Sequence, residues 1–305
     1  MGRSRYPLGG LLGEFETIQL AGRANRTQGE GEMTDTILVA TDGSADGNAA
    51  ERLGVSLAGR LQCRATGITV IEDARVQIPD SPGLTLPPYP EPDLTAYFRA
   101  RADALAARFA ERARVEGLDA GCEIAQGRAD DRIVEKAQSF DLLVIGRDGR
   151  PADAKGALIG STTESVIRKT SRSTVVVPFG ASLSGPIVLG FDGSPGSRIA
   201  AATAVELANK LGESIHVFVD SKDKGRAVAR FEEVRQLLSG LAQPIRETSS
   251  TLGRPDVKIV DTAREAGAGL IVMGAYGRNR ITDYFLGSNA AAVVRTAPVS
   301  VLLAR

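Results

Sequence analysis

The residues that could do chemistry in this chain form a glycine-rich pattern near its C-terminus. Gly274 and Gly277 follow the apolar run 270–273, and after a spacer of nine residues Gly287 and Ser288 precede an alanine-rich stretch. Glycines at the end of a buried strand let the backbone turn sharply and approach a ligand closely. A glycine and a serine at a helix N-terminus present free amides and a hydroxyl where the helix dipole favours anions. The spacing therefore indicates a site for phosphate.

A second copy of this pattern lies in the first half of the chain. Another apolar run leads into a glycine pair, and a spacer that is one residue longer then leads into a helical stretch. The residues of this copy are Gly146, Gly149, Gly160, Ser161 and Thr162. A single glycine pair is more often a turn or a helix cap. Two copies in the same strand, loop and helix context favour a phosphate site.

The repeat extends beyond the glycine loops. Residues 37–44 match residues 187–194, and each segment is an apolar run that ends in Asp-Gly-Ser. Residues 127–134 likewise match residues 253–260. The chain is therefore a tandem duplication of one unit. The sequence predicts domains at 34–180 and 181–305, preceded by a disordered leader over 1–33.

Strands that alternate with helical stretches predict an α/β fold with a parallel sheet covered on both faces. We expect strands at 36–41, 65–71, 121–125, 141–146 and 173–178 in the first half, and at 186–191, 214–219, 245–249, 269–274 and 298–303 in the second. A ligand should then lie beyond the carboxyl ends of the strands. If strands one and four are neighbours, Asp42 or Asp192 meets the glycine loop of its own half.

These residues suggest a division of labour within a nucleotide site. The glycine loop, with Ser161 and Thr162 or with Ser288, would bind phosphates, and the aspartate of the same half would bind adenine or ribose. Asp-Gly-Ser is also a common Asx turn or N-cap, so the local sequence leaves both readings of Asp42 and Asp192 open.

Both halves resemble domains of the universal stress protein family, and in particular its ATP-binding subfamily. The signature of that subfamily is G-x2-G-x9-G-(S/T), with an aspartate at the end of the first strand, and the C-terminal half matches it without departure. The resemblance covers about residues 34–305. It implies two tandem doubly wound, Rossmann-like domains of five parallel strands in the order 3-2-1-4-5. It also implies ATP, AMP or ADP as the ligand.

The resemblance also supplies positions for the site, including valines on the second strands as walls beside the base. In the first half the candidates are Thr41, Asp42, Val70, Gly146, Gly149, Gly160, Ser161 and Thr162. In the second half they are Phe191, Asp192, Val217, Gly274, Gly277, Gly287, Ser288 and Asn289. In similar proteins the final strands pair between domains, so residues 175–177 and 299–301 should meet within the chain. A homodimer through other faces stays open.

The first half departs from the signature by its longer spacer and by Asp148, whose carboxylate would lie close to bound phosphates. This is unfavourable unless Arg147, Arg150, Lys155 or a metal ion offsets the charge. We therefore expect the N-terminal site to be the weaker one. The alternative is that Asp148 helps to hold Mg²⁺.

Composition limits other functions. Lysine plus arginine equals aspartate plus glutamate at 37 each, so no global field attracts nucleic acid or a membrane. Cys63 and Cys122 match no metal motif and are expected to be buried thiols in a reducing compartment. The single histidine, His216, is expected to be a strand residue near the sheet's edge or the cleft.

The sequence and the resemblance together predict a cytoplasmic stress-response regulator that binds adenine nucleotide. No catalytic motif is present, so any ATP hydrolysis should be slow and incidental. Two alternatives stay open: a nucleotide-consuming hydrolase or adenylyl-transfer enzyme, and an interaction module with vestigial sites. The six prolines in residues 73–93 predict a long loop before a helix at 94–116. Such a loop is a lid, a partner contact or disordered.

Overall fold

The computed structural model describes residues 34–72, 91–149, 159–276 and 286–305, with the side chains of 91–94 left out. Residues 34–305 form one compact unit. The expectations for the leader and for most of the proline-rich loop lie outside the described residues. The helix after that loop begins at Glu91, three residues earlier than expected, because proline is tolerated in the first turn of a helix.

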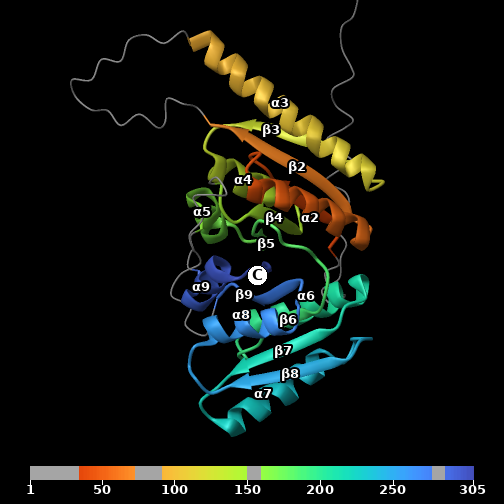
Figure 1. Ribbon diagram of the computed structural model, residues 1–305, viewed down its shortest axis with the longest axis vertical. Coiled ribbons are helices and arrows are strands. Elements are labelled where there is room, and N and C mark those ends of the chain that lie inside the picture. Colours follow the sequence, from red (N-terminus) through yellow and green to blue (C-terminus); the bar gives the residue numbers. More distant parts are fainter. Residues whose placement is uncertain (1–33, 73–90, 150–158, 277–285) are drawn as a thin grey trace, which may run out of the picture. The chain divides into compact units, whose positions relative to one another are not determined.

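Each half alternates strands and helices (Figure 1). The first half contains β1 (Thr36–Ala40), α2 (Ala45–Leu61), β2 (Arg64–Ile71), α3 (Glu91–Val115), β3 (Cys122–Gln126), α4 (Ala129–Ala137), β4 (Leu142–Gly146), α5 (Ser161–Lys169) and β5 (Ser173–Val177). The second contains β6 (Ile187–Gly190), α6 (Pro195–Leu211), β7 (Ile215–Asp220), α7 (Lys224–Leu237), β8 (Ile245–Ser250), α8 (Pro255–Glu265), β9 (Leu270–Gly274), α9 (Ser288–Thr296) and β10 (Ser300–Ala304). All ten predicted strands are present.

The ten strands form one continuous sheet in the order β3-β2-β1-β4-β5-β10-β9-β6-β7-β8. Each half therefore has the order 3-2-1-4-5, and its strands are parallel to one another. The two halves join where β5 pairs with β10 in antiparallel register, with Val176 opposite Val301 and Val175 opposite Leu302. The contact on the second half lies at residues 301–303, slightly beyond the expected 299–301.

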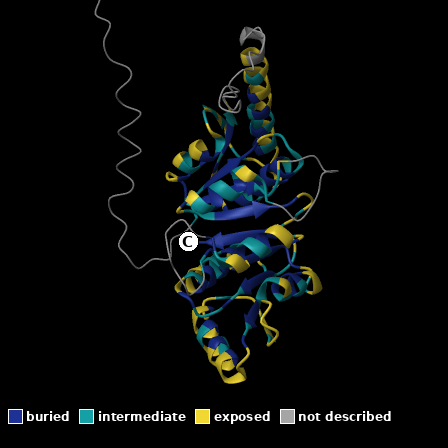
Figure 2. Cartoon of the chain, turned by 90° about the vertical axis from the view of Figure 1, so that its left-hand side faces the viewer, coloured by how far each residue is buried: buried dark blue, intermediate teal, exposed yellow. Residues whose placement is uncertain are grey.

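Two helical layers cover the sheet because its side chains alternate between the two faces. Ile37 and Val39 face the core beneath α2, α3, α6 and α7. Leu38 and Ala40 face the core beneath α4, α5, α8 and α9. Figure 2 shows the sheet buried between these layers. Most strands are apolar on both faces, as a doubly covered parallel sheet requires.

The turn after the first strand has the same construction in both halves. Gly43 and Gly193 adopt φ angles of 81° and 76°, a region that favours glycine. Ser44 and Ser194 then cap the next helix, their side chains accepting hydrogen bonds from the amides of the third residue beyond. The matched Asp-Gly-Ser motifs thus start α2 and α6 directly at the carboxyl ends of β1 and β6.

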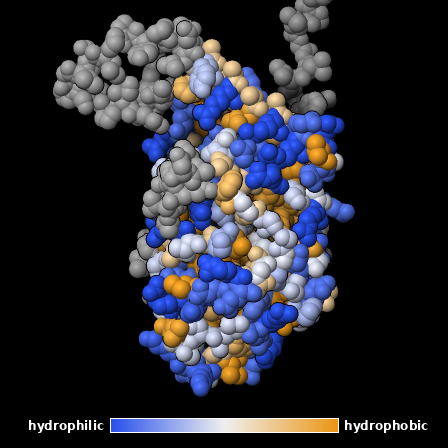
Figure 3. Space-filling model, viewed as in Figure 1, coloured by the Kyte–Doolittle hydropathy of each residue, from blue (hydrophilic) through white to orange (hydrophobic). Residues whose placement is uncertain are grey.

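The outer surface of the molecule is mixed in character. On the face shown in Figure 3, hydrophobic residues form small groups scattered among hydrophilic ones. Within the described ranges, no helix is both long enough and apolar enough to cross a membrane.

Candidate functional site

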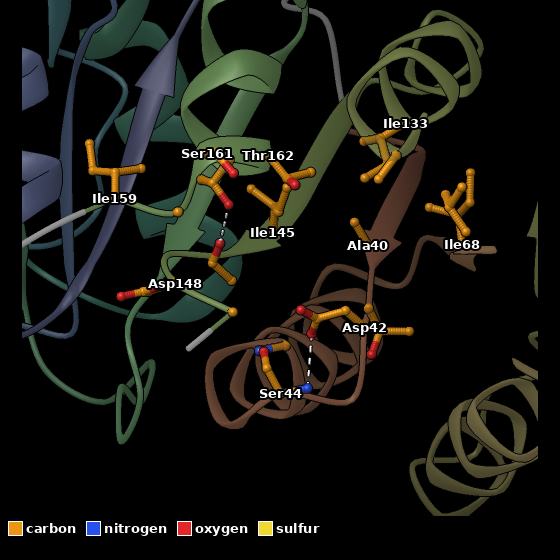
Figure 4. A pocket seen from close by; sticks show the side chains of 18 of the residues that line it. Ala40, Asp42, Ser44, Ile68, Ile133, Ile145, Asp148, Ile159, Ser161 and Thr162 are labelled. Carbon is orange, nitrogen blue, oxygen red and sulfur yellow. Dashed lines mark hydrogen bonds between the residues drawn. The ribbon is translucent and has the colours of Figure 1, made fainter. Parts of the chain in front are cut away.

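A cavity of about 540 Å³ opens at the carboxyl ends of the strands in the first half (Figure 4). It is surrounded by the C-terminal parts of β1, β2 and β4, by the first turns of α2 and α5, and by α4. Its lining residues are Ala40, Thr41, Asp42, Ser44, Gly47, Ile68, Val70, Glu72, Ala129, Ile133, Ile145, Gly146, Asp148, Gly149, Ile159, Gly160, Ser161, Thr162 and Thr163. Every candidate residue of the first half lies in this lining. The strand order explains why, since β1 lies between β2 and β4.

The cavity has an apolar side and a polar side. Ala40, Ile68 and Ile145 are buried ends of three neighbouring strands, and Ile133 of α4 closes the apolar side. The polar side combines the turn after β1 with the N-terminus of α5. An apolar wall that faces a few polar groups is typical of small-molecule sites.

Asp42 forms the turn that the sequence allowed, and its carboxylate also lies beside the glycine loop, while its role in binding adenine or ribose stays a prediction. Its Oδ1 accepts a hydrogen bond from the amide of Ser44 at 2.9 Å, so the residue forms an Asx turn. A Cβ atom added to Gly149 would lie 2.9 Å from Oδ2 of Asp42, so the same carboxylate also reaches the glycine loop. The structure therefore brings Asp42 and this loop together, as the strand order predicted.

The glycines of the motif differ in what they do. A Cβ atom on Gly146 would lie 2.7 Å from the backbone of Asp46, and one on Gly274 would lie 2.6 Å from the backbone of Gly196. The first glycine of each motif therefore lets a helix N-terminus pack against the strand. A Cβ atom on Gly160 would make only ordinary contacts at 3.5 Å.

The N-terminus of α5 is the part of the site best suited to an anion. Gly160 is the N-cap and has no side chain to occupy the first amides of the helix. Ser161 and Thr162 follow it in the cavity lining, while the Oγ1 of Thr163 donates to the carbonyl of Gly146 at 2.7 Å. Unoccupied amides at a helix start, together with the dipole, favour a phosphate or a carboxylate.

A salt-bridged carboxylate anchors this helix. Asp130 of α4 is buried and accepts hydrogen bonds from Ser165 and Lys169 of α5, both at 2.6 Å. Burial alone would raise the pKa of Asp130, but the hydrogen bonds from Lys169, Ser165 and Arg128 outweigh burial and hold that pKa far below its usual range. The carboxylate therefore stays charged and fixes α5 against α4.

Sequence reasoning missed Asp46, which changes the surroundings of the glycine loop. Asp46 is buried in the first turn of α2 and accepts the amide of Asp148 at 3.1 Å. Arg147 turns away from the cavity and donates to the carbonyl of Ala297 in the other half at 2.8 Å. It therefore does not offset Asp148 as expected, and Arg150 and Lys155 lie outside the described residues.

Sequence reasoning also missed the cluster that holds Thr41. The Oγ1 of Thr41 donates to Glu51, which is fully buried and pairs with Arg108 and Arg112 of α3. Arg101 of the same helix donates to the carbonyl of Asp42 at 2.9 Å. Thr41 lies at the cavity, but its hydroxyl faces α3, so α3 holds the turn in place. No local motif signals these partners, because α3 lies far along the chain.

Two candidate residues of the second half belong to the core. Phe191 is 2% exposed and Val217 is fully buried, and both lie on the face beneath α6 and α7, away from a cleft equivalent to that of the first half. The assignment of Val217 to a base wall is therefore wrong, whereas the part of Phe191 in a site stays a prediction. The pairing of the strands explains the error. Ala40 and Gly190 are matched positions of the repeat; Ile68 lies opposite Ala40, and Phe218 lies opposite Gly190. Two residues further on, Val70 therefore corresponds to Asp220 and not to Val217.

The other candidates of the second half keep their expected places. Asp192 accepts the amide of Ser194 at 2.9 Å, the same turn that Asp42 makes. Gly287 is the N-cap of α9, and Ser288 and Asn289 are exposed in its first turn. Gly277 lies outside the described residues.

The histidine and the cysteines take structural places. His216 lies on β7 with its Nε2 2.8 Å from the Oγ1 of Thr248, and burial, followed by the charge of Arg246, lowers its pKa. Both cysteines are free thiols. Burial raises the pKa of Cys63 to about 11 and that of Cys122 to about 12. In the part of the chain that the structure describes, no group of three or more acidic, histidine or cysteine side chains could hold a metal ion.

The fold and the cavity define a class: a tandem α/β protein of Rossmann-like units, with a cleft beyond the carboxyl ends of a parallel sheet. The family model described as "Universal stress protein family" matches residues 33–178 and again residues 184–305. The chain belongs to the universal stress protein family, with two domains in tandem.

Universal stress proteins align with most of this chain in sequence, and a solved structure shares its fold. A universal stress protein of Mycobacterium tuberculosis (strain H37Rv) is 26% identical over 295 residues, which cover 88% of this chain and 96% of that protein. One of Mycolicibacterium smegmatis is 27% identical over 288 residues, with the same coverage. The crystal structure of a universal stress protein from Archaeoglobus fulgidus has a TM-score of 0.71 at 18% identity and covers 89% of this chain and 98% of its own.

Proposed function

We propose that this protein binds adenine nucleotide in the cleft of its first half and acts as a nucleotide-dependent regulator of the stress response. The observation that carries the proposal is the cavity itself. It joins a buried apolar wall, a carboxylate on a tight turn and an uncapped helix N-terminus within about 540 Å³. Small-molecule sites have volumes of about 300–1,000 Å³.

The order of the strands suggests how the nucleotide would lie. Phosphates would bind at the N-terminus of α5, beside β4. The ribose would then lie near Asp42 at the end of β1, and the base near Val70 at the end of β2. Neighbouring strands are about 4.8 Å apart, so the ends of β4 and β2 are separated by about 10 Å. A nucleotide can span this distance with its phosphates at one end and its base at the other.

The polar groups of the cleft support binding better than catalysis. Asp42 accepts the amide of Ser44, Thr163 donates to the carbonyl of Gly146, and Thr41 donates to Glu51. These side chains hold the turn, the loop and the strand ends in place. A general base would need to lie within hydrogen-bond reach of a nucleophile, and none of these three contacts forms such a pair. We therefore propose a regulatory role, with the bound nucleotide as the signal.

Titration calorimetry with ATP and ADP tests the proposal. Val70 is half-buried at the base end of the cleft, so Val70→Trp should fill that end and weaken ATP binding at least tenfold, or by about 1.4 kcal/mol. The control is Val228→Trp, at a valine that is 56% exposed on α7. Unchanged ATP affinity in a folded Val70→Trp variant would refute this site. Failure of the native protein to bind millimolar ATP or ADP would refute the proposal as a whole.

A further inference from the structure

The cleft of the first half and the equivalent place in the second half, here called the second cleft, differ at the end of the second strand. Val70 lies two residues beyond Ile68 on β2, and Asp220 lies two residues beyond Phe218 on β7. Ile68 and Phe218 are equivalent, because the carbonyl of Ile68 accepts the amide of Thr41 and the carbonyl of Phe218 accepts that of Phe191, both at 2.9 Å, and these two residues precede the matched Asp42 and Asp192. Phe218 packs beneath α8, and alternation along the strand puts Asp220 on the same face. Asp220 therefore takes the place that Val70 has in the first cleft.

One oxygen of the Asp220 carboxylate lacks a hydrogen-bond partner. This atom, Oδ1, is buried, and no donor reaches it from any residue of the described ranges. The backbone carbonyl of Asp220, by contrast, accepts from Arg230 at 2.7 Å. An ionised carboxylate can only accept hydrogen bonds, and a buried acceptor without a donor costs free energy. A ligand with N–H groups at this place would remove that cost.

A second charge differs between the two clefts. Glu72 lines the first cleft two residues beyond Val70, and Lys222 lies two residues beyond Asp220. The side chain of Lys222 passes over Gly253, where an added Cβ atom would lie 3.2 Å from its Cε. The first cleft therefore has an apolar side chain and a carboxylate at its base end. The second has a carboxylate and an ammonium group.

The apolar walls remain similar in the two halves. Ile259 corresponds to Ile133 of the first cleft, and Met273 corresponds to Ile145. Ile259 packs against Gly190, since a Cβ atom added to Gly190 would lie 2.8 Å from the Cδ1 of Ile259. Both clefts therefore offer a flat base an apolar surface. The polar groups that would face the edge of the base are what distinguish the two.

The edge of guanine matches the second cleft. Guanine presents N1–H and N2–H₂ as adjacent donors, followed by O6 as an acceptor. A carboxylate can accept from both donors, and an ammonium group can donate to O6. Adenine presents an acceptor, N1, next to its amino group, so its lone pair would face the negative charge of Asp220. We propose that the C-terminal cleft binds a guanine nucleotide, with Asp220 accepting from N1–H and N2–H₂ and Lys222 donating to O6.

This inference rests on the proposed function, because it assumes that nucleotides enter both clefts with their phosphates at the N-termini of α5 and α9. Calorimetry with GDP on protein saturated with ADP separates the two ideas. GDP should still bind with one-to-one stoichiometry. ADP occupies the first cleft, but its adenine binds poorly in the second cleft, which is left for GDP.

Asp220→Asn provides the sharper test because it changes one acceptor into a donor without changing shape. GDP affinity should fall at least tenfold, and affinity for xanthosine diphosphate should rise at least tenfold, since xanthine replaces the N2 amino group with an oxygen. The matched control is Asp223→Asn, at the N-cap of α7, where asparagine is an equally good cap. The control should leave both affinities unchanged.

The outcomes are distinguishable. If ADP binds but GDP competes with it for one site, and Asp220→Asn changes neither GDP nor xanthosine diphosphate binding, the inference is overturned and the proposed function stands. If neither ADP nor GDP binds the native protein, both fail. Loss of GDP binding without a gain for xanthosine diphosphate would also overturn the inference, because a disturbed fold alone would produce that loss.

Discussion

Replacing Glu51 by glutamine should destabilise the protein more than any comparable change at a surface ion pair. The Glu51 carboxylate is fully buried beneath α3 and receives hydrogen bonds from Arg108, Arg112 and Thr41. Burial lowers the pKa of Arg112, and the charge of Glu51 partly offsets this effect. Glutamine has nearly the same shape but no charge, so the two guanidinium groups would keep their places without a counter-ion.

The expected loss of unfolding free energy depends on how far the side chains of Arg108 and Arg112 are exposed to water. Removing one member of a fully buried pair costs about 3–5 kcal/mol, because the other charge stays in the interior. The side chains of Arg108 and Arg112 are 35% and 24% exposed, so water can solvate part of their charge in the variant. We therefore expect Glu51→Gln to lower the free energy of unfolding by about 2–4 kcal/mol, somewhat below the range for a fully buried pair.

Urea unfolding followed by circular dichroism measures this change. Glu111→Gln is the control, because Glu111 pairs with Arg114 on the exposed side of the same helix and should leave the unfolding free energy unchanged. Replacing Glu51, Arg108 and Arg112 together by methionine should recover much of the loss, since apolar residues of similar volume can replace a buried ion cluster. A loss below about 1 kcal/mol for Glu51→Gln would refute the reasoning, because only a well-solvated pair costs so little.

Three further predictions concern the same domain. The pKa of Asp130 lies below its ordinary value of 3.8, so its charge stabilises the fold above that pH and the contribution is lost as pH falls; acid unfolding of Asp130→Asn should show a weaker pH dependence than the native protein. Cys63 is buried and should react with a thiol reagent at pH 7 only at the rate of unfolding, whereas Cys122 is partly exposed and should react slowly because burial raises its pKa; fast labelling of either thiol in the native protein would contradict this. Gly146→Ala should lower the melting temperature by more than Gly160→Ala, because only at Gly146 would the added methyl group lie closer than 3.0 Å to backbone atoms, while alanine at the Gly160 N-cap carries only the smaller cost of a poorer cap; equal decreases would contradict the packing role.

The strands of the fold could be predicted from the sequence because the duplication repeats each of the motifs that mark them. Apolar runs that end in Asp-Gly-Ser or in a glycine pair identified the strands, and all ten appear in the structure. The order 3-2-1-4-5 came from the family resemblance, and the structure confirms it in both halves. The start of α3 was misplaced by three residues because proline was treated as excluding a helix, although it is compatible with a first turn.

The candidate site was predicted less completely, for two physical reasons. Side-chain direction alternates along a strand, so an alignment error of an odd number of residues puts a side chain on the opposite face. The assignment of Val217 to the cleft is off by three residues for this reason, and Asp220 is the residue that corresponds to Val70. Partners that come from distant elements leave no local pattern, as with Glu51 and the arginines of α3. The relative strength of the two phosphate sites stays a prediction, because Gly277 and most of both spacers lie outside the described residues.

The pairing of β5 with β10 determines how the two clefts are related. Strands within each half are parallel, and the strands of one half run opposite to those of the other. The carboxyl ends of the strands, where each cleft is expected, therefore point in opposite directions in the two halves. The glycine loop of the first half nevertheless contacts the second half, because Arg147 donates to the carbonyl of Ala297 just beyond α9. In the second half the link is indirect: Arg305 donates to the carbonyl of Ile167 in α5 and to the hydroxyl of Tyr276. The two halves are therefore joined near their glycine loops as well as along the sheet.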